Sequence, residues 1–239
     1  MIYMIKSYAH VVLVCMFVSS LAICCQDGNA QNDSTISIDH MENLRWGIYN
    51  DSEENCSIEL SMAEGELPNS AGVNISYDFK EKNTWVGIYK RIDFGEFPPL
   101  EGLRFHYNGN GTPNSIELKL VDKRGRTFGY ICSCATVTDG WRTIEADERD
   151  IEYWWGGPTS LSPIKHVDLG EVEEIHFAIS NKLGDALGKG YIIIDEVEGI
   201  KKQGWIEKHW DKIRDLISII AIILSGIFGY IKGGKKKIK

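Results

Sequence analysis

Residues 102–111 read GLRFHYNGNG and carry the clearest structural signal in the chain. Apolar and polar side chains alternate along this segment: Leu103, Arg104, Phe105, His106 and Tyr107. A period of two residues is typical of a β-strand with one buried face. The asparagines and glycines that follow favour a polar loop. The segment therefore predicts a strand over residues 102–107 whose apolar face lies in a core.

Short alternating runs of the same kind continue on both sides of this strand. They predict further strands at residues 57–62, 73–79, 84–94, 115–121, 127–136, 141–146, 172–180 and 189–197. Two of these runs present apolar sets that can share a core with the first strand: Ile116, Leu118 and Leu120, and Ile175, Phe177 and Ile179. Because no helix-length periodic run lies between residues 36 and 200, we expect an all-β sandwich of two stacked sheets.

The composition fits one globular domain with terminal extensions, since 43% of the 239 residues are hydrophobic and 25% are charged. A content of 24 glycines and 6 prolines excludes a collagen-like chain and favours a β-rich domain with many turns. Acidic residues number 34 and basic residues 26, which gives a net charge of −8. An acidic protein repels phosphate groups, so we expect no nucleic acid partner.

The N-terminal residues 1–30 have the pattern of a secretory signal peptide, with an apolar stretch at residues 9–25 followed by a polar run. Cleavage after Ala30 or after Ala22 would remove the apolar stretch. Two alternatives stay open: a lipoprotein modified at one of the adjacent cysteines 24 and 25, and an uncleaved anchor helix. The first alternative is disfavoured because the residue before the modified cysteine should be small.

The C-terminal part of the chain has the pattern of a single-pass membrane anchor. Residues 201–215 form a predicted stalk, the uncharged run 216–231 a predicted transmembrane helix, and residues 232–239 a basic cytoplasmic tail. The run is at the short end of the roughly 17 to 25 residues needed to span a bilayer. A buried terminal helix and an interfacial helix are the alternatives. The predicted location is the cell membrane, with the domain extracellular or periplasmic.

Several short patterns occur in an order that resembles a known group of modules. They are Asp39-His40-Met41-Glu42, Trp46, residues 102–111, Gly140-Trp141-Arg142-Thr143-Ile144, Trp155-Gly156-Gly157 and Tyr191-Ile192-Ile193-Ile194-Asp195-Glu196-Val197. Over residues 36–200 the chain resembles the galactose-binding-like jelly-roll modules, most of all the family 11 carbohydrate-binding module and the complex I intermediate-associated protein domain. The resemblance implies a jelly-roll β-sandwich domain at residues 31–200 that binds either a glycan or another protein.

The candidate carbohydrate-binding residues are aromatic and polar side chains on predicted strands or beside a turn. They are Tyr89, Arg91, Arg104, His106, Trp154, Trp155 and His176. Flat aromatic rings can stack on the apolar faces of sugar rings, while the polar groups bind hydroxyls. Of the two adjacent indoles, Trp154 is expected to be the more exposed. The alternatives are indoles that cover the core and a polar face that is merely solvated.

The resemblance also implies a structural calcium ion, because the first and last strands meet in the related fold. Asp39, Glu42 and Asp195 are the candidate ligands on those strands, and carboxylate oxygens are the ligands that calcium prefers. Ordinary surface carboxylates in an acidic domain are the alternative. The ion is the one cofactor that the sequence suggests.

Motifs for nucleophilic catalysis, nucleotide binding and zinc proteolysis are missing from the sequence, so we expect that the protein is not an enzyme. The predicted function is a non-catalytic carbohydrate-binding module, displayed outside the cytoplasm on a C-terminal membrane anchor, with a polysaccharide or glycan as its partner. The alternative is a membrane-tethered protein-interaction, adhesion or assembly scaffold. Loss of sugar binding on removal of an aromatic ring would separate the two.

Overall fold

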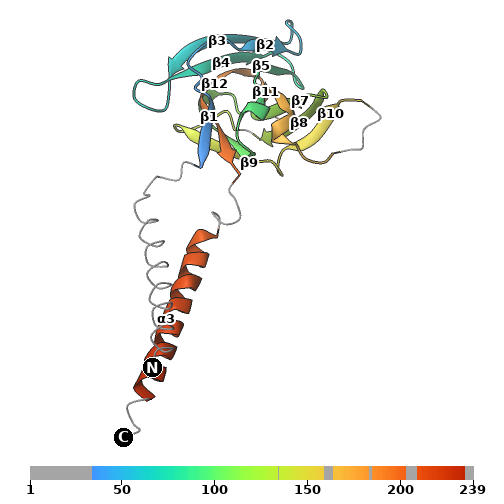
Figure 1. Ribbon diagram of the computed structural model, residues 1–239. Helices are drawn as coiled ribbons and strands as arrows, with labels where there is room; N and C mark the ends of the chain where they lie inside the picture. The colour runs from blue at the N-terminus through green and yellow to red at the C-terminus, as the bar shows by residue number, and fades with distance from the viewer. Residues whose placement is uncertain (1–33, 134, 159–163, 183–184, 203–208, 235–239) are drawn as a thin grey trace. The chain divides into compact units, whose positions relative to one another are not determined.

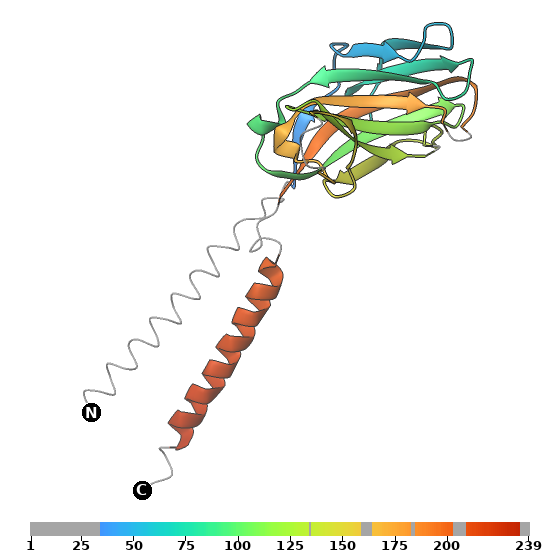
Figure 2. The same ribbon diagram turned by 90° about the vertical axis from the view of Figure 1, so that its right-hand side faces the viewer.

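The computed structural model describes residues 34–133, 135–158, 164–182, 185–202 and 209–234. Two antiparallel sheets form a sandwich (Figure 1), and Figure 2 shows their strands in two layers. The first sheet has the order β3-β4-β12-β6-β9, with β1 paired to β12. Its strands are β1 (Thr35–Asp39), β3 (Cys56–Glu64), β4 (Ala71–Phe79), β6 (Leu100–Gly111), β9 (Arg142–Asp147) and β12 (Gly188–Lys201).

The second sheet has the order β10-β8-β7-β11-β5-β2. Its strands are β2 (Gly47–Asn50), β5 (Trp85–Arg91), β7 (Ser115–Asp122), β8 (Arg126–Cys132), β10 (Glu152–Gly156) and β11 (Val172–Ser180). Two 3-10 turns, η1 (Phe94–Glu96) and η2 (Leu169–Glu171), flank this sheet. The predicted all-β sandwich is therefore confirmed. All strands that the alternation predicts are present, and β1, β2 and β10 are additional.

The core lies between the two sheets and holds the apolar sets that the alternation predicts. Leu103, Phe105 and Tyr107 of β6 are buried, and their neighbours Arg104 and His106 are only partly so. From the second sheet, the inward residues of β7 and β11 are buried against them: Ile116, Leu118, Leu120, Ile175, Phe177 and Ile179. Phe105 and Phe177 meet edge to face with ring centroids 4.9 Å apart. This burial of large side chains is the main stabilising contribution to the sandwich.

The turn between β7 and β8 is closed by one carboxylate. Asp122 Oδ1 accepts hydrogen bonds from the backbone N–H groups of Arg124 and Arg126, each at 2.9 Å. Gly125 has a φ of +71°, a conformation that glycine adopts at no steric cost. Asp122 Oδ2 also lies 2.6 Å from the guanidinium of Arg126. These bonds fix the hairpin and therefore the register of the two strands.

The predicted signal peptide lies outside the described residues, as do parts of the predicted stalk and basic tail. The C-terminal helix α3 (Trp210–Gly234) contains the run 216–231 and begins six residues before it, within the predicted stalk. In the described part of the chain, no helix combines the length and the apolar character needed to cross a membrane.

Candidate binding groove

One face of the second sheet points away from the core and carries the candidate site. On β7, Ile116 points into the core, so the next residues, Glu117, Lys119 and Val121, alternate onto the outer face. The strand register extends this arrangement across the sheet, because His176 of β11 pairs with Lys119. The outward side chains of neighbouring strands therefore form rows across the face.

Two aromatic rings pack closely on glycines of this face. Gly87 of β5 pairs with Tyr49 of β2, and a Cβ atom at Gly87 would lie 2.6 Å from Cζ of Tyr49. In the same way, a Cβ atom at Gly129 of β8 would lie 2.2 Å from Cζ2 of Trp154. Carbon atoms cannot approach so closely, so these rings occupy the space that a larger residue would fill. The two glycines thus leave room for these rings, and the face is hollowed beside the Tyr49 ring.

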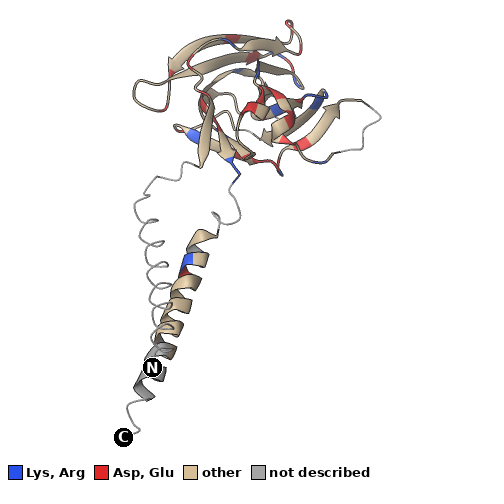
Figure 3. Cartoon of the chain, in the orientation of Figure 1, with Lys and Arg blue, Asp and Glu red and all other residues tan. Residues whose placement is uncertain are grey.

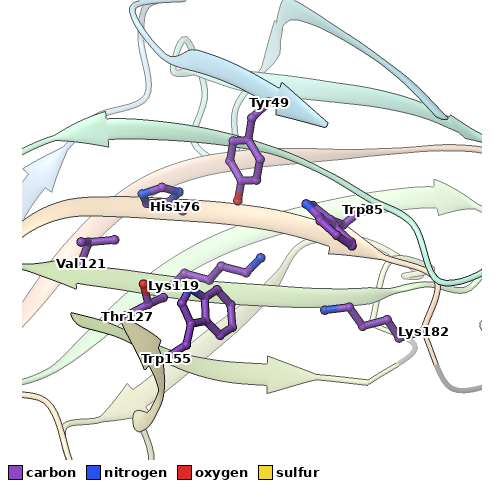
Figure 4. Close-up of a pocket in the computed structure, with 8 residues that line it drawn as sticks. All are labelled: Tyr49, Trp85, Lys119, Val121, Thr127, Trp155, His176 and Lys182. Carbon is purple, nitrogen blue, oxygen red and sulfur yellow. The ribbon is translucent and has the colours of Figure 1, made fainter. Parts of the chain in front are cut away.

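The hollow is a groove of about 420 Å³, drawn in Figure 4, that we call the aromatic groove. Strands β2, β5, β7, β8, β10 and β11 all contribute to it, and Lys182 follows β11. It is lined by Tyr49, Trp85, Lys119, Val121, Thr127, Trp155, His176 and Lys182. Three aromatic rings and two lysines thus face one concave surface, which is the composition of a small-molecule or sugar site.

A buried carboxylate lies beneath the two lysines. Glu117 is 1% exposed, and Lys182 Nζ donates a 3.0 Å hydrogen bond to its Oε1. Lys119 Nζ lies 3.0 Å from the other oxygen as an ion pair, without hydrogen-bond geometry. Burial would raise the pKa of Glu117, but the charge of Lys119 and the bond from Lys182 help to hold it below its ordinary value. The carboxylate is therefore ionised and anchors both lysines.

The lysines lie beside the rings of the groove. Lys119 Nζ is 5.9 Å from the centroid of the Tyr49 ring and 5.8 Å from that of the Trp155 ring. Lys182 Nζ is 5.5 Å from the Trp85 ring. These are cation–π distances, and such contacts help to order long side chains.

The remaining polar rings of the groove are uncharged at neutral pH. Burial lowers the pKa of His176 more than the nearby Glu174, at 3.3 Å, can raise it. Burial raises the pKa of Tyr49, and the negative charge of Glu117 raises it further. His176 is stacked on Tyr89, with centroids 5.5 Å apart and an angle of 29° between the planes. His176 and Tyr49 thus offer neutral hydrogen-bonding groups beside the two lysines.

The exposed indole is Trp155 and not Trp154, which corrects the sequence expectation. Trp155 is 52% exposed and lines the groove, whereas Trp154 is half-buried over Gly129. The cause is a register shift in β10: Tyr153 pairs with Phe128, but Trp155 pairs with Thr127. Such a bulge places two successive side chains on one face. The two indoles are stacked, with centroids 5.5 Å apart.

The other predicted binding residues of the second sheet lie near the groove. Tyr89 is 39% exposed and adjoins it through its stacking on His176. The Arg91 side chain is 82% exposed and pairs with Glu174 at 2.9 Å, outside the lining. The structure therefore brings Trp155 and His176 into the groove, places Tyr89 and Trp154 next to it, and leaves Arg91 at its edge.

Arg104 and His106 lie on β6 in the first sheet, away from the groove. Arg104 forms ion pairs with Glu145 at 2.7 Å and Glu198 at 3.4 Å. His106 Nδ1 lies 2.5 Å from Glu66. Their predicted outward orientation is confirmed. However, both residues lie on the sheet opposite the groove, so they cannot contact the same sugar ring as Trp155. The sequence pattern indicates which face of a strand is polar, not which sheet contains the strand.

Of the three candidate calcium ligands, Glu42 is exposed, and Asp39 and Asp195 already have other partners in this structure. Asp39 pairs with Lys90 and accepts a 2.8 Å hydrogen bond from the backbone of Met41. Asp195 accepts from the backbone of Glu66 at 2.8 Å and from the Ser70 hydroxyl at 3.0 Å. Among the residues that the structure describes, no group of three or more His, Cys, Asp or Glu side chains could hold a metal ion. Calcium binding would therefore require these carboxylates to exchange partners.

Six lining residues are absent from the sequence-based candidates: Tyr49, Trp85, Lys119, Val121, Thr127 and Lys182. On a period of two residues, Trp85 shares the face of Tyr89, and Lys119 lies opposite the apolar set of Ile116, Leu118 and Leu120. Tyr49 lies on a strand that the sequence did not predict, and Lys182 lies after the end of β11. Only the pairing of the strands brings them together.

Comparison with known proteins shows the same fold in sugar-binding modules. A family 11 carbohydrate-binding module from Clostridium thermocellum, in complex with a β-1,3-1,4-mixed-linked tetrasaccharide, matches with a TM-score of 0.56 and 19% identity over 70% of this chain and 95% of the module. This chain has the fold of a family 11 carbohydrate-binding module. The family 11 module of a cellulosomal cellulase from the same organism matches with a TM-score of 0.55 and 17% identity, again over 70% of this chain and 95% of that one.

A solution structure of a family 11 module matches with a TM-score of 0.58 and 18% identity, over 73% of this chain and 99% of the other. No protein-family model matches the sequence. No curated protein matches it either. The family 11 likeness therefore concerns the fold, and the resemblance noted in the sequence is confirmed at that level.

Proposed function

We propose that this protein is a non-catalytic carbohydrate-binding module whose aromatic groove holds a saccharide chain. The observation that carries the proposal is the arrangement of Tyr49, Trp85 and Trp155 around one concave face. Pyranose rings have apolar faces that pack on flat aromatic rings. The polar groups between the rings can bind hydroxyls and fix the orientation of the ligand. The shared fold with family 11 modules supports the proposal.

The absence of catalysis is part of the proposal. Hydrolysis of a glycosidic bond needs two carboxyl groups about 5 to 10 Å apart on either side of the bond. The aromatic groove, as described, is lined by no Asp or Glu. The carboxylate beneath it, Glu117, is buried and held by two lysines. An ionised and ion-paired carboxylate cannot donate the proton that the leaving group needs.

The test is a binding screen of the full chain against a panel of polysaccharides and oligosaccharides, with Trp155→Ala as the probe variant. We expect the variant to bind at least about 10-fold more weakly, because a central aromatic ring often dominates an interface. Tyr191→Ala is the matched control, since Tyr191 is a 38% exposed aromatic residue on β12 of the other sheet. A folded protein that binds no saccharide would contradict the proposal and favour a protein partner.

We propose further that residues 216–231 tether the sandwich to the cell membrane in a single pass, with the sandwich outside the cytoplasm. The sequence supports this, and so does the exposure of large apolar side chains on α3, such as Ile222 at 71%. Between residues 210 and 225, the charged residues of α3 all lie in its first turns, at residues 211–215 (Figure 3). One test is alkaline extraction of isolated membranes. A second test, on a separate sample, is protease digestion of intact cells. Recovery in the soluble fraction would contradict a membrane tether.

A further inference from the structure

The aromatic groove carries more positive than negative charge. Lys119 and Lys182 share one carboxylate, that of Glu117. The eight groove-lining residues of the described chain include no Asp or Glu. The two ammonium groups extend toward each other in Figure 4. The pKa of Lys119 is lowered by burial and also by the positive charge of Lys182, as expected for repulsion between like charges. One positive charge is therefore left over, and an anion between the lysines would offset the repulsion.

The polar groups of the groove are mainly hydrogen-bond donors. A lysine ammonium group donates and cannot accept. The Tyr49 hydroxyl is buried and has no hydrogen-bond partner in the described structure. It keeps its proton, so it can also donate. A buried donor without a partner is costly, and an acceptor that enters the groove would relieve this. A neutral sugar offers hydroxyls that both donate and accept, whereas a carboxylate or sulfate group only accepts.

Both lysine ammonium groups of the groove lie close to an aromatic ring. Lys119 Nζ lies over the Trp155 ring, 5.8 Å from its centroid, and Lys182 Nζ lies over the Trp85 ring, 5.5 Å from its centroid. A pyranose that stacks on an indole directs its equatorial substituents outward in its own plane. A charged substituent would therefore leave the edge of the stacked ring and meet an ammonium group.

We propose that the aromatic groove prefers acidic saccharides, whose sugar rings bear a carboxylate or a sulfate ester, over neutral ones. The inference rests on the proposed function, because it assigns a ligand class to the same groove. The acidic group contacts Lys182 and Lys119, and the sugar faces pack on Trp85 and Trp155. Since the whole chain has a net charge of −8, the preference is local and does not come from long-range attraction.

The experiment compares saccharides that share a sugar backbone and differ in whether the acidic group is charged or present, by calorimetric titration of the full chain. One pair is an oligogalacturonate and its methyl ester, and the other is a sulfated carrageenan oligosaccharide and its desulfated form. We expect the acidic member of at least one pair to bind about 10-fold more tightly, as a charge-assisted hydrogen bond allows. The preference shrinks at 1 M salt, where charges are screened within about 3 Å.

Variants assign the preference to the lysines. Lys182→Gln is expected to remove most of the preference for the acidic member of a pair, while Lys182→Arg retains it. Glu117 keeps its pair with Lys119 in both variants, and their melting curves confirm folding. Lys202→Gln is the matched control, because Lys202 is also exposed, at 56% against 41% for Lys182, and also pairs with one carboxylate, Glu148.

The possible outcomes separate the two proposals. Equal affinity for both members of both pairs overturns the acidic preference but leaves the proposed function standing. Failure to bind any saccharide overturns both. An acidic preference that survives Lys182→Gln overturns the role of this lysine.

Discussion

At the scale of single residues, Gly87 controls the shape of the aromatic groove. A Cβ atom there would lie 2.6 Å from Cζ of Tyr49 and 2.8 Å from the backbone oxygen of Phe177, which cannot move aside. We expect Gly87→Ala to lower the free energy of unfolding by about 2 kcal/mol, the usual cost of overpacking. Urea denaturation measures it. Gly170→Ala is the control, because its nearest contact is an ordinary 3.5 Å, and an equal loss in both variants would contradict the steric argument.

Glu117 links the groove to stability. We expect Glu117→Gln to lower the free energy of unfolding by about 3 kcal/mol, because the buried ammonium group of Lys119 and the more exposed one of Lys182 lose their counter-charge. Thermal and urea unfolding measure the change. Glu145→Gln is the control, since Glu145 is 55% exposed and its pair with Arg104 lies at the surface, where about 1 kcal/mol or less is expected.

The same carboxylate gives a pH dependence of known sign. The pKa of Glu117 is lower in the folded protein than its ordinary value of 4.5. Its contribution to stability is therefore complete above about pH 4.5 and is lost as the pH falls through the folded value. Melting curves from pH 7 to pH 3 should show a steeper loss in the wild type than in Glu117→Gln. Parallel curves for the two proteins would contradict this assignment.

The sequence predicts individual site residues only in part, as the two indoles illustrate. Alternation along a strand identifies outward side chains, and it does so for His176 and Lys119. It fails at Trp155, because the bulge between Tyr153 and Trp155 interrupts the period of two. A bulge depends on the pairing with the neighbouring strand β8, which a single strand's sequence does not contain.

At the scale of elements, the β7–β8 hairpin positions one wall of the groove. Asp122 closes its turn, and β8 carries β10 with Trp155. We expect Asp122→Ala to lower the free energy of unfolding by about 3 kcal/mol, because it leaves the buried Arg126 and two backbone N–H groups without their acceptor. Chemical denaturation measures the change.

The matched control for this hairpin is Asp93→Ala. Asp93 also accepts a backbone hydrogen bond, from Gly95, and pairs with Lys123 at 3.3 Å, but it is exposed. We expect a loss of about 1 kcal/mol or less. If the two variants were equally destabilised, burial of the turn carboxylate would not be the cause.

Elements with a buried face were predictable, and short edge elements were not. The central strands β6, β7 and β11 each present several alternating apolar residues to the core, which gives a strong signal. β2 has four residues and β10 has five, and their residues are mostly exposed or half-buried. Because such strands bury little, their sequences carry no clear period, yet both contribute aromatic residues to the groove.

At the scale of the whole molecule, the calcium prediction remains to be tested. A structural ion at Asp39 and Asp195 predicts that a chelator lowers the melting midpoint of the full chain by several degrees, as the loss of a bound ligand does. Lys90 holds Asp39 in the structure, so the ion would have to displace it. The measurement is thermal melting with calcium and then with EDTA, and an unchanged midpoint would contradict the prediction.

The stacked indoles give the protein an intrinsic optical signal. Trp154 and Trp155 lie with centroids 5.5 Å apart and planes 28° from parallel. Two chromophores so close couple their electronic transitions, and the resulting band in circular dichroism depends on their mutual orientation. Trp155 also lines the aromatic groove. A ligand that tilts this ring would therefore change the exciton band, and occupancy could be followed without a label.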